Sequence, residues 1–344
     1  MPLRVLTVMA GAPYGGFETF FVTLSTALRR AGVAVHAVLR PNAIRETALK
    51  EGDVALDTLP FHRWLDMRTR SGLRQIAGRF RPDAVLTFAG RASSMMPKGD
   101  YPLIARLGGY YKLHYFRNCD YLVCITPDIV RHAVEGGWKK EKVFYIPNFP
   151  VVQSSPPLDR AVFGTPKNVP LAIALARLHP SKALDVLLRA VAKVPGLWLW
   201  IAGEGPEGAA LKKLTSELGI EDRVRFLGWR TDRSALLRAA DVCVFPSRWE
   251  PNGTVVVEAW AHDVPLVTAA SAGPKWIARD GEDALIAPVD DVDALADRIR
   301  RVLGSKELAK KLVANGGARV EKEFTEAAVI GKYIDMFEKV RAKR

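Results

Sequence analysis

Residues 4–39 read RVLTVMAGAPYGGFETFFVTLSTALRRAGVAVHAVL. The β-branched run 4–9 predicts a strand, and the apolar side chains at helical spacing in 17–30 predict a helix after a glycine-bearing loop. The run 33–39 predicts the next strand. A strand, a helix and another strand in succession indicate a parallel sheet with helices on both faces.

This alternation continues along the chain with one interruption. The proline- and serine-rich segment 148–170 has no usable period, so we place an interdomain linker at 151–169. Further strands are expected at 84–88, 103–107, 121–125 and 143–146 before it, and at 171–175, 197–202, 224–227, 242–245, 265–268 and 284–286 after it. We therefore predict an α/β protein with two doubly wound, Rossmann-like domains, 1–150 and 170–324. A last amphipathic helix at 325–344 is expected to pack back toward the first domain.

The composition is typical of a folded globular protein. Of the 344 residues, 49% are hydrophobic and 25% are charged, which suits two domains of roughly 150 residues each. No run approaches the ~20 apolar residues of a membrane span, and the first ten residues lack the features of a signal peptide. We expect a cytoplasmic protein whose cysteines, Cys119, Cys124 and Cys243, are reduced core residues rather than metal or redox groups.

The net charge of +13 implies attraction to an anionic partner. Residues 1–150 contain 21 Lys and Arg against 12 Asp and Glu, so the excess is concentrated in the first half. Residues 62–81 (HRWLDMRTRSGLRQIAGRFR) carry six arginines and one acid, interleaved with apolar residues. Two interpretations stay open: a peripheral contact with the anionic inner face of the cytoplasmic membrane, or an ordinary helix that buries its apolar stripe.

The densest polar group lies in 245–261 (FPSRWEPNGTVVVEAWA). A strand ends there in a loop that holds Glu250, and a helix that contains Glu258 follows. The residues at the start of this helix are Asn252, Gly253, Thr254 and Val255. The asparagine or the threonine can cap the helix, the glycine lets a ligand approach the backbone, and the free N–H groups of the last two form an anion site that suits a diphosphate.

The spacing of Glu250 and Glu258 in EPNGTVVVEAWA resembles the signature of the family 4 retaining glycosyltransferases (glycosyl transferases group 1), which have the GT-B fold. Other segments that match in order and spacing are 175–182 (LARLHPSK), 201–206 (IAGEGP), 224–229 (VRFLGW) and 271–277 (SAGPKWI). In the first half, the match is limited to YGGFE at 14–18 and to the strand order. The resemblance implies an acceptor-binding first domain and a donor-binding second domain that face each other across a cleft.

The resemblance also implies the chemistry of that cleft. A sugar would pass with retention from a nucleotide diphosphate sugar, UDP-linked rather than GDP-linked, to an envelope, lipopolysaccharide, exopolysaccharide or lipid-linked glycan, without a metal ion or other cofactor. Arg177 and Lys182 would neutralise the diphosphate and the leaving group. Glu250 would bind the transferred sugar and stabilise an oxocarbenium-like centre, and Glu258 would bind the ribose. The further donor contacts would be Gly15, Gly16, Gly203, Leu227, Asn252, Gly253, Thr254 and Val255.

One stretch departs from the family pattern. Many members have a histidine near the transferred sugar, whereas 105–114 here reads ARLGGYYKLH, with glycines at that place. Gly109, Tyr110 and His114 are the candidate acceptor or sugar-site residues, with His114 structural or acceptor-facing rather than catalytic. A protein base is not obligatory, because in a retaining transfer on one face the leaving phosphate can take the acceptor's proton. Asn252 stands where an aromatic residue is common, a change that bears on donor choice.

Three alternatives belong to other classes. GEGPEG at 203–208 fits the dinucleotide fingerprint, but it follows the second strand of its sheet rather than the first. A sugar-nucleotide epimerase of similar fold would convert the donor without any acceptor. A nucleic-acid-binding protein would use the basic surface, although no recognised nucleic-acid module is present. A monomer suffices for the transferase, since one chain supplies both halves of the cleft.

Overall fold

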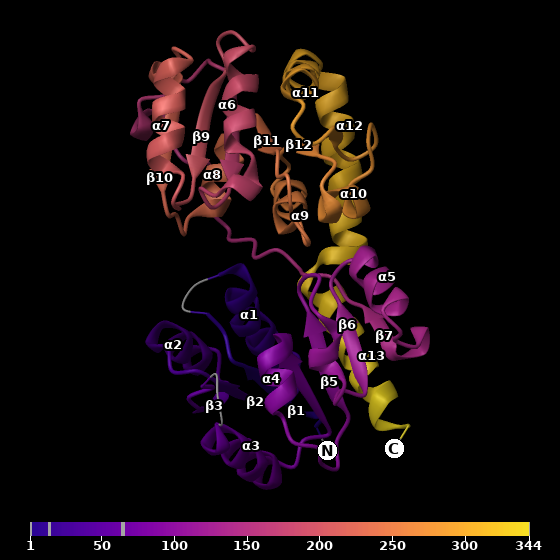
Figure 1. The fold of residues 1–344 in the computed structure, drawn as a ribbon. Coiled ribbons are helices and arrows are strands. Elements are labelled where there is room, and N and C mark those ends of the chain that lie inside the picture. The colour runs from indigo at the N-terminus through magenta and orange to yellow at the C-terminus, as the bar shows by residue number, and fades with distance from the viewer. Residues whose placement is uncertain (1, 13–14, 63–65, 344) are drawn as a thin grey trace. The chain divides into compact units, whose positions relative to one another are not determined.

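The computed structural model describes residues 2–12, 15–62 and 66–343. It divides the chain into two compact units, residues 1–148 with 326–344 and residues 149–325 (Figure 1). Each unit contains one open, wholly parallel sheet, flanked by helices. The predicted class, two doubly wound α/β domains, is therefore confirmed.

The first unit contains a seven-stranded sheet in the order β3-β2-β1-β4-β5-β6-β7. Its strands are β1 (Arg4–Met9), β2 (Ala34–Leu39), β3 (Ala55–Thr58), β4 (Ala84–Phe88), β5 (Leu103–Leu107), β6 (Tyr121–Cys124) and β7 (Val143–Tyr145). The strand β3 is absent from the predictions because none of its four residues is buried, so it lacks the apolar pattern of a strand. Met9 lies beside both Leu39 and Phe88, so β1, β2 and β4 end at one edge.

Six helices flank this sheet in the described chain. They are α1 (Gly16–Arg30), α2 (Ala43–Glu51), α3 (Met67–Phe80), α4 (Ala89–Met95), α5 (Pro127–Glu135) and α13 (Glu326–Arg341), with 3₁₀ turns at Leu113–Phe116 and Lys140–Lys142. Asn42, Asp66 and Thr126 precede α2, α3 and α5, and each accepts a hydrogen bond from the backbone N–H three residues later. These side-chain caps explain where the three helices begin.

The last helix, α13, belongs to the first unit (Figure 1). Its Tyr333 hydroxyl accepts a hydrogen bond of 3.1 Å from Nε of Arg106 on β5. Only 1% of Arg106 is exposed, and its guanidinium lies 4.4 Å from the ring centroid of Phe20 on α1. Arg30 and Glu326 pair at 2.7 Å at the start of the helix. The buried cation, stacked on an aromatic ring, thus joins α1, β5 and α13.

The second unit contains a six-stranded sheet in the order β10-β9-β8-β11-β12-β13. Its strands are β8 (Leu171–Leu175), β9 (Trp198–Ala202), β10 (Val224–Gly228), β11 (Val242–Phe245), β12 (Leu266–Ala269) and β13 (Leu285–Ala287). Its helices are α6 (Leu184–Ala192), α7 (Gly208–Glu217), α8 (Arg233–Ala239), α9 (Thr254–Ala261), α10 (Ala272–Ile277), α11 (Val292–Gly304) and α12 (Lys306–Arg319). Short turns occur at Arg160–Phe163, Pro180–Lys182 and Glu221–Arg223, and a π-helix at Val320–Phe324 follows α12.

The segment 151–169, predicted as a linker, is packed on the second unit. The N–H of Gln153 donates to Ser234 Oγ at 3.1 Å, and the N–H of Leu158 donates to the carbonyl of Ala235 at 3.0 Å. Arg160 pairs with Asp241 at 2.9 Å. The polar groups of 151–169 thus bond to α8 and to Asp241, just before β11, contacts that an aperiodic sequence does not reveal.

Each unit has its own hydrophobic core between sheet and helices. Cys119 and Cys124 are buried in the first core and Cys243 in the second, and none of the three is in a disulfide. Burial raises the pKa of each thiol to about 12. The prediction that they are core residues is confirmed.

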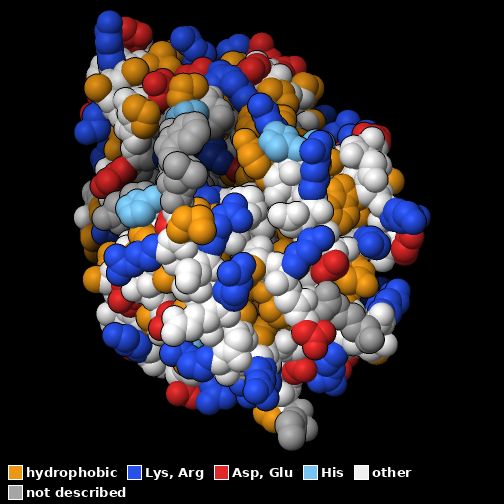
Figure 2. Space-filling model, turned by 60° about the horizontal axis from the view of Figure 1, so that its bottom comes forward, with side chains coloured by type: hydrophobic (Ala, Val, Ile, Leu, Met, Phe, Trp, Pro, Cys, Tyr) orange, Lys and Arg blue, Asp and Glu red, His pale blue; other side chains and the backbone are white. Residues whose placement is uncertain are grey.

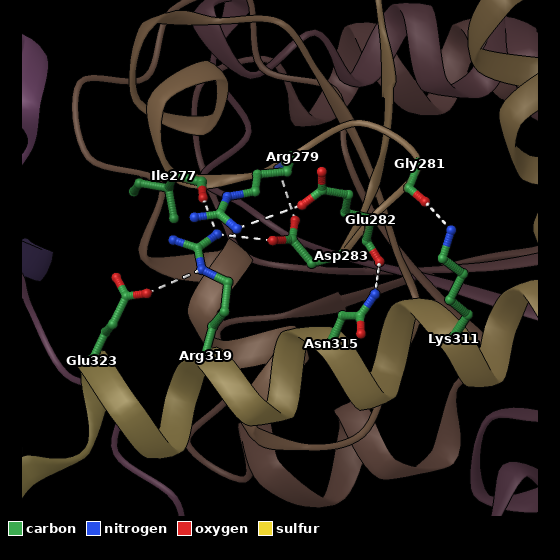
Figure 3. Close-up of polar contacts among 9 residues, drawn as sticks. All are labelled: Ile277, Arg279, Gly281, Glu282, Asp283, Lys311, Asn315, Arg319 and Glu323. Atoms are coloured by element: carbon green, nitrogen blue, oxygen red, sulfur yellow. Dashed lines mark hydrogen bonds and ion pairs between the residues drawn. The ribbon is translucent and has the colours of Figure 1, made fainter.

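Helix α12 holds the loop between α10 and β13 (Figure 3). Nη1 of Arg319 donates to the carbonyl of Ile277 at 2.5 Å and to Asp283 Oδ2 at 2.8 Å. The Arg319 guanidinium lies 5.0 Å from the ring centroid of Trp260, whose indole N–H donates to the Asp283 carbonyl at 2.8 Å. Asn315 donates to a third carbonyl of the loop. Trp260 is on α9, so one cluster anchors α9, α10 and this loop.

The basic segment 62–81 includes helix α3, which buries Leu73 and Ile76 against the first core. Met67 is 70% exposed, and the arginines at 68, 70 and 74 are exposed. Residues 63–65 lie outside the described structure. Lys and Arg side chains are spread over the whole face drawn in Figure 2, with fewer Asp and Glu among them. The helix thus buries an apolar stripe, and contact with an anionic membrane stays a prediction.

Within the described ranges, no helix combines the length and the apolar character that crossing a bilayer requires.

Candidate functional site

In the second sheet, the strand order runs outward in two directions from the neighbours β8 and β11. Open parallel sheets bind ligands beyond the carboxyl ends of their strands at such a point. The two loops that leave β8 and β11 there, 176–183 and 246–253, contain Lys182 and Glu250. The sequence motifs therefore lie at the edge where a ligand is expected.

Lys182 and Glu250 form an ion pair between these two loops. Their side chains are 19% and 13% exposed, so the pair is largely shielded from water. The second carboxylate oxygen of Glu250 accepts hydrogen bonds from the N–H groups of Asn252 and Gly253, both at 3.2 Å. Both charged groups are therefore positioned by protein contacts alone.

Helix α9 begins directly after this loop, and Gly253 is its N-cap residue. The φ angle of Gly253 is 77°, a left-handed conformation that favours glycine. The prediction that Asn252 or Thr254 caps the helix is wrong, because the Asn252 amide donates to the Thr254 hydroxyl at 2.5 Å instead. Among the described residues, the N–H groups of Thr254 and Val255 have no acceptor. They stay available to an anion at the positive end of the helix.

Glu258, in the second turn of α9, forms an ion pair with Arg233 at the start of α8. The Glu258 side chain is 13% exposed and that of Arg233 is 44% exposed. Arg233 is not among the predicted site residues, because only the fold brings α8 beside α9. The arginine fixes the carboxylate, which can accept hydrogen bonds from ligand hydroxyl groups.

His262, just after α9, is a buried neutral base beside Glu258. Its Nδ1 lies 2.7 Å from the Glu258 carbonyl, so Nδ1 carries the proton, and Nε2 accepts from Ser234 Oγ at 2.8 Å. Burial lowers the pKa of His262 from its ordinary 6.5, and the positive charges of Arg238 and Arg233 lower it further.

This lowered pKa predicts a loss of stability in acid. Below pH 6.5 the unfolded chain protonates at this position and the folded chain does not, so the free energy of unfolding falls as the pH drops toward the folded pKa. Chemical denaturation between pH 7.5 and 5 measures this slope. The His262→Gln variant, which has no titrating ring, is expected to show a smaller slope, and an equal slope in both proteins would contradict the assignment.

Arg248 is not among the predicted site residues, yet it holds the turn that ends in Lys182. Its Nη1 donates to the Pro180 carbonyl at 2.8 Å, and its two terminal nitrogens bind both carboxylate oxygens of Asp185 at 2.8 and 2.6 Å. Its Nε pairs with Asp290 at 2.5 Å. The hydrogen bond with Asp185 raises the pKa of Arg248. No local pattern indicates this role, because the partners are far away in the sequence.

Arg177 is exposed on the loop after β8, and within the described chain its side chain has no ion pair or hydrogen bond. Gly203, after β9, packs against that loop: a Cβ on it would lie 2.0 Å from the Ala176 carbonyl oxygen. A Cβ on Gly205 would lie 2.3 Å from the Leu178 carbonyl oxygen. These glycines of GEGPEG thus allow two loops to touch, a structural role that does not need a dinucleotide.

Leu227 is half-buried near the end of β10. The following residue, Gly228, accepts a hydrogen bond of 2.8 Å from the N–H of Gly203. The structure therefore places Leu227 and Gly203 on neighbouring strand ends of one sheet edge.

The start of α10 lies directly against the Glu250 loop. The N–H of Gly273 donates to the Glu250 carbonyl at 2.6 Å, and a Cβ on Gly273 would lie 2.8 Å from the carbonyl oxygens of both Glu250 and Asn252. Two hydroxyl groups, those of Ser247 and Ser271, are buried and lack a partner among the described residues. Native proteins leave few buried polar groups unpaired, so two such hydroxyl groups at the Glu250 loop are unusual.

Gly15 and Gly16 begin helix α1 in the first unit, and Gly15 is its N-cap residue. A Cβ on Gly15 would lie 2.3 Å from a carboxylate oxygen of Glu18, so a larger residue there would require the Glu18 side chain to move. Glu18 accepts the N–H of Ala12 at 2.8 Å and so shapes the loop before α1. Tyr14 of the YGGFE motif lies outside the described residues. Contact of the two glycines with a donor stays a prediction.

The three candidate acceptor residues have different surroundings. Gly109 is buried, and the Tyr110 hydroxyl donates to Asp128. Burial, together with this hydrogen bond, raises the pKa of Tyr110. His114 is exposed in the turn Leu113–Phe116 and stacks on Tyr115, with ring centroids 4.1 Å apart. Their roles stay predictions.

No group of three or more His, Cys, Asp or Glu is arranged to hold a metal ion in the part of the chain that the structure describes. Metal independence of the reaction stays a prediction that only an assay can test.

The sequence of the chain is similar to known glycosyltransferases. Residues 157–319 match the family model described as glycosyl transferases group 1. The chain is 35% identical over 336 residues to the lipopolysaccharide core biosynthesis glycosyltransferase LpsE of Rhizobium meliloti (strain 1021), covering 94% of this chain and 95% of that protein. It is also 35% identical over 348 residues to LpsD of the same strain, another glycosyltransferase of lipopolysaccharide core biosynthesis, covering 99% and 100%.

A solved structure supports the fold. The structure of Anabaena HepE in complex with UDP superposes with a TM-score of 0.82 and 17% sequence identity, covering 98% of this chain and all of that one. At this identity the likeness concerns the fold.

Proposed function

The chain belongs to the glycosyl transferases group 1 family and has its GT-B fold, and from this premise we propose that it transfers a sugar from a UDP-sugar to a lipopolysaccharide core glycan or a related envelope glycan. The enzyme class, glycosyltransferase, follows from the family. The donor, the acceptor, retention of the anomeric configuration and independence of metal are proposals.

One observation carries the donor proposal: the Lys182–Glu250 pair and the N–H groups at the start of α9, which have no acceptor in the described structure, lie together at one sheet edge. An ammonium group and helix N–H groups attract a diphosphate, and both stabilise the negative charge that grows on it as the sugar departs. Arg177 adds an exposed cation from the same loop as Lys182.

The acceptor proposal rests on the relatives. LpsE and LpsD both act in lipopolysaccharide core biosynthesis, and the likeness to them covers almost the whole chain, the first unit included. UDP is the nucleotide bound in the HepE structure. These observations favour a UDP-sugar and an envelope glycan over the other donors and acceptors.

A thermal-shift screen tests the donor proposal. UDP and UDP-sugars, at about 100 times their dissociation constant, are expected to stabilise the protein by about 2.7 kcal/mol. GDP, ADP and NAD are tested as ligands of other classes. The thermal shift with UDP should persist in excess EDTA. A larger shift with GDP would move the proposal to a GDP-sugar, whereas a shift with NAD alone would overturn it.

A further inference from the structure

Two arginines of the first unit converge on one backbone carbonyl group. Arg40 follows β2, and its Nε donates to the Pro60 carbonyl at 3.1 Å while its Nη2 donates to the Phe61 carbonyl at 2.5 Å. Nη1 of Arg91, in the first turn of α4, also reaches the Phe61 carbonyl, at 3.4 Å. The two guanidinium groups are therefore held side by side.

Neither arginine has an acidic partner among the described residues, although the same structure pairs many other arginines with Asp or Glu. No Asp or Glu occurs among the residues that the structure does not describe, which are 1, 13–14, 63–65 and 344. Asp66, five residues after Phe61, is occupied by Thr69 and by the N–H of His62. Burial lowers the pKa of Arg40, and the charge of Arg91 lowers it further. A carbonyl dipole does not neutralise two cations, so the pair lacks a negative charge.

The backbone around the pair adopts two unusual conformations. Phe61 is fully buried with a φ angle of 49°, and Ala89, the first residue of α4, has a φ angle of 61°. The left-handed conformation costs a residue with a Cβ about 1 kcal/mol or more. The Phe61 N–H donates to Thr69 Oγ1 at 3.0 Å, which holds this residue in place. The two strained residues, Phe61 and Ala89, thus lie in the segments that carry the Phe61 carbonyl and Arg91.

The location of the pair is that of a ligand site. In the order β3-β2-β1-β4-β5-β6-β7, the direction in which the chain adds strands reverses at β1 and β4. Ligands of open parallel sheets bind beyond the carboxyl ends of the strands at such a reversal. Arg40 follows β2, the neighbour of β1, and Arg91 follows β4. The two arginines therefore flank the place in the first unit where a bound molecule is expected.

We propose that Arg40 and Arg91 bind a carboxylate or phosphate group on the acceptor glycan, so that the acceptor is anionic. The planar guanidinium forks match both oxyanions, and the added charge would relieve the repulsion between the two cations. Arg91 is exposed and can meet the ligand directly, whereas Arg40 is half-buried and bound to the backbone. The proposal names the acceptor class and so rests on the proposed transferase function.

Ligand-observed NMR on the full chain tests the site without any turnover. The probes are D-glucuronate for a carboxylate, inorganic phosphate for a phosphate and D-glucose as the uncharged control, each with UDP at saturation so that phosphate is kept from the donor site. We expect the wild type to bind one of the two anions and not glucose. The Arg91→Gln variant is expected to bind that anion about 10- to 100-fold more weakly, as charged hydrogen bonds are lost.

The matched control is Arg74→Gln, which removes another exposed arginine, from α3. It should bind the anion as the wild type does, and its thermal unfolding and that of Arg91→Gln should match the wild type. Equal anion binding by wild type and Arg91→Gln, an equal loss in Arg74→Gln, or no anion binding by the wild type would overturn the proposal. Absence of UDP binding with Arg91-dependent anion binding intact would instead count against the proposed function.

Discussion

Replacement of Lys182 by alanine is expected to lower kcat by about 100- to 1,000-fold, the effect typical of removing one positioned group that stabilises developing negative charge. Lys182 is the cation that the fold holds next to Glu250 at the sheet edge. Without it, the leaving diphosphate loses its ammonium partner, and the mostly buried Glu250 carboxylate loses its counter-ion. Steady-state transfer from UDP-sugars to a lipopolysaccharide core acceptor measures the effect.

Lys311→Ala is the matched control for this variant. Lys311 belongs to the same unit, and its ammonium donates to the Gly281 carbonyl at 2.9 Å, on the loop held by α12 (Figure 3). Its removal should leave kcat within twofold of the wild-type value. If Lys182→Ala unfolds near the wild-type temperature and keeps its full kcat, the proposed role of Lys182 is wrong.

Glu258→Ala is expected to weaken UDP binding by about 10- to 100-fold, because hydrogen bonds between hydroxyl groups and a carboxylate are worth roughly 1.5–3 kcal/mol. The carboxylate is mostly buried at the second turn of α9 and is fixed by Arg233. Isothermal titration with UDP gives the dissociation constant. The kcat at saturating donor should change less than the affinity, since the ribose does not react.

The Arg233→Ala variant distinguishes a direct contact between Glu258 and the ribose from an effect of the Arg233–Glu258 ion pair. This variant keeps the Glu258 carboxylate and removes only the more exposed partner. We expect a loss of UDP affinity clearly smaller than that of Glu258→Ala. Equal losses in the two variants would show that the ion pair matters rather than a contact between Glu258 and the ligand.

Most of the fold could be predicted from local patterns. Short, mostly apolar runs such as 4–9 and 171–175 form central strands, because a strand buried on both faces must be largely apolar. The strand β3 could not be found, since a half-exposed edge strand carries no such pattern. The packing of 151–169 on the second unit could not be predicted, because its hydrogen bonds go to residues more than 70 positions away.

The candidate site divides in a similar way. Lys182, Glu250 and Glu258 could be named from the sequence, because their segments resemble motifs of the group 1 glycosyltransferases. The partners that hold them, Arg233 and Arg248, could not be named, because Arg233 meets Glu258 and Arg248 meets the turn at Pro180–Lys182 only after folding. The capping of α9 was also misjudged, since the left-handed Gly253 leaves the Asn252 and Thr254 side chains to bond to each other.

The sequence by itself determined the two-sheet architecture, the family and the motif residues, because apolar periodicity and short spacings are local properties of a chain. Tertiary structure alone decided which charges are paired. It joined Lys182 to Glu250 and Glu258 to Arg233, and it left Arg40 and Arg91 together without an acid among the residues that the structure describes. The physical reason is that electrostatic energy depends on distances of a few ångströms between side chains, and in a parallel sheet those distances join residues that are far apart in the sequence.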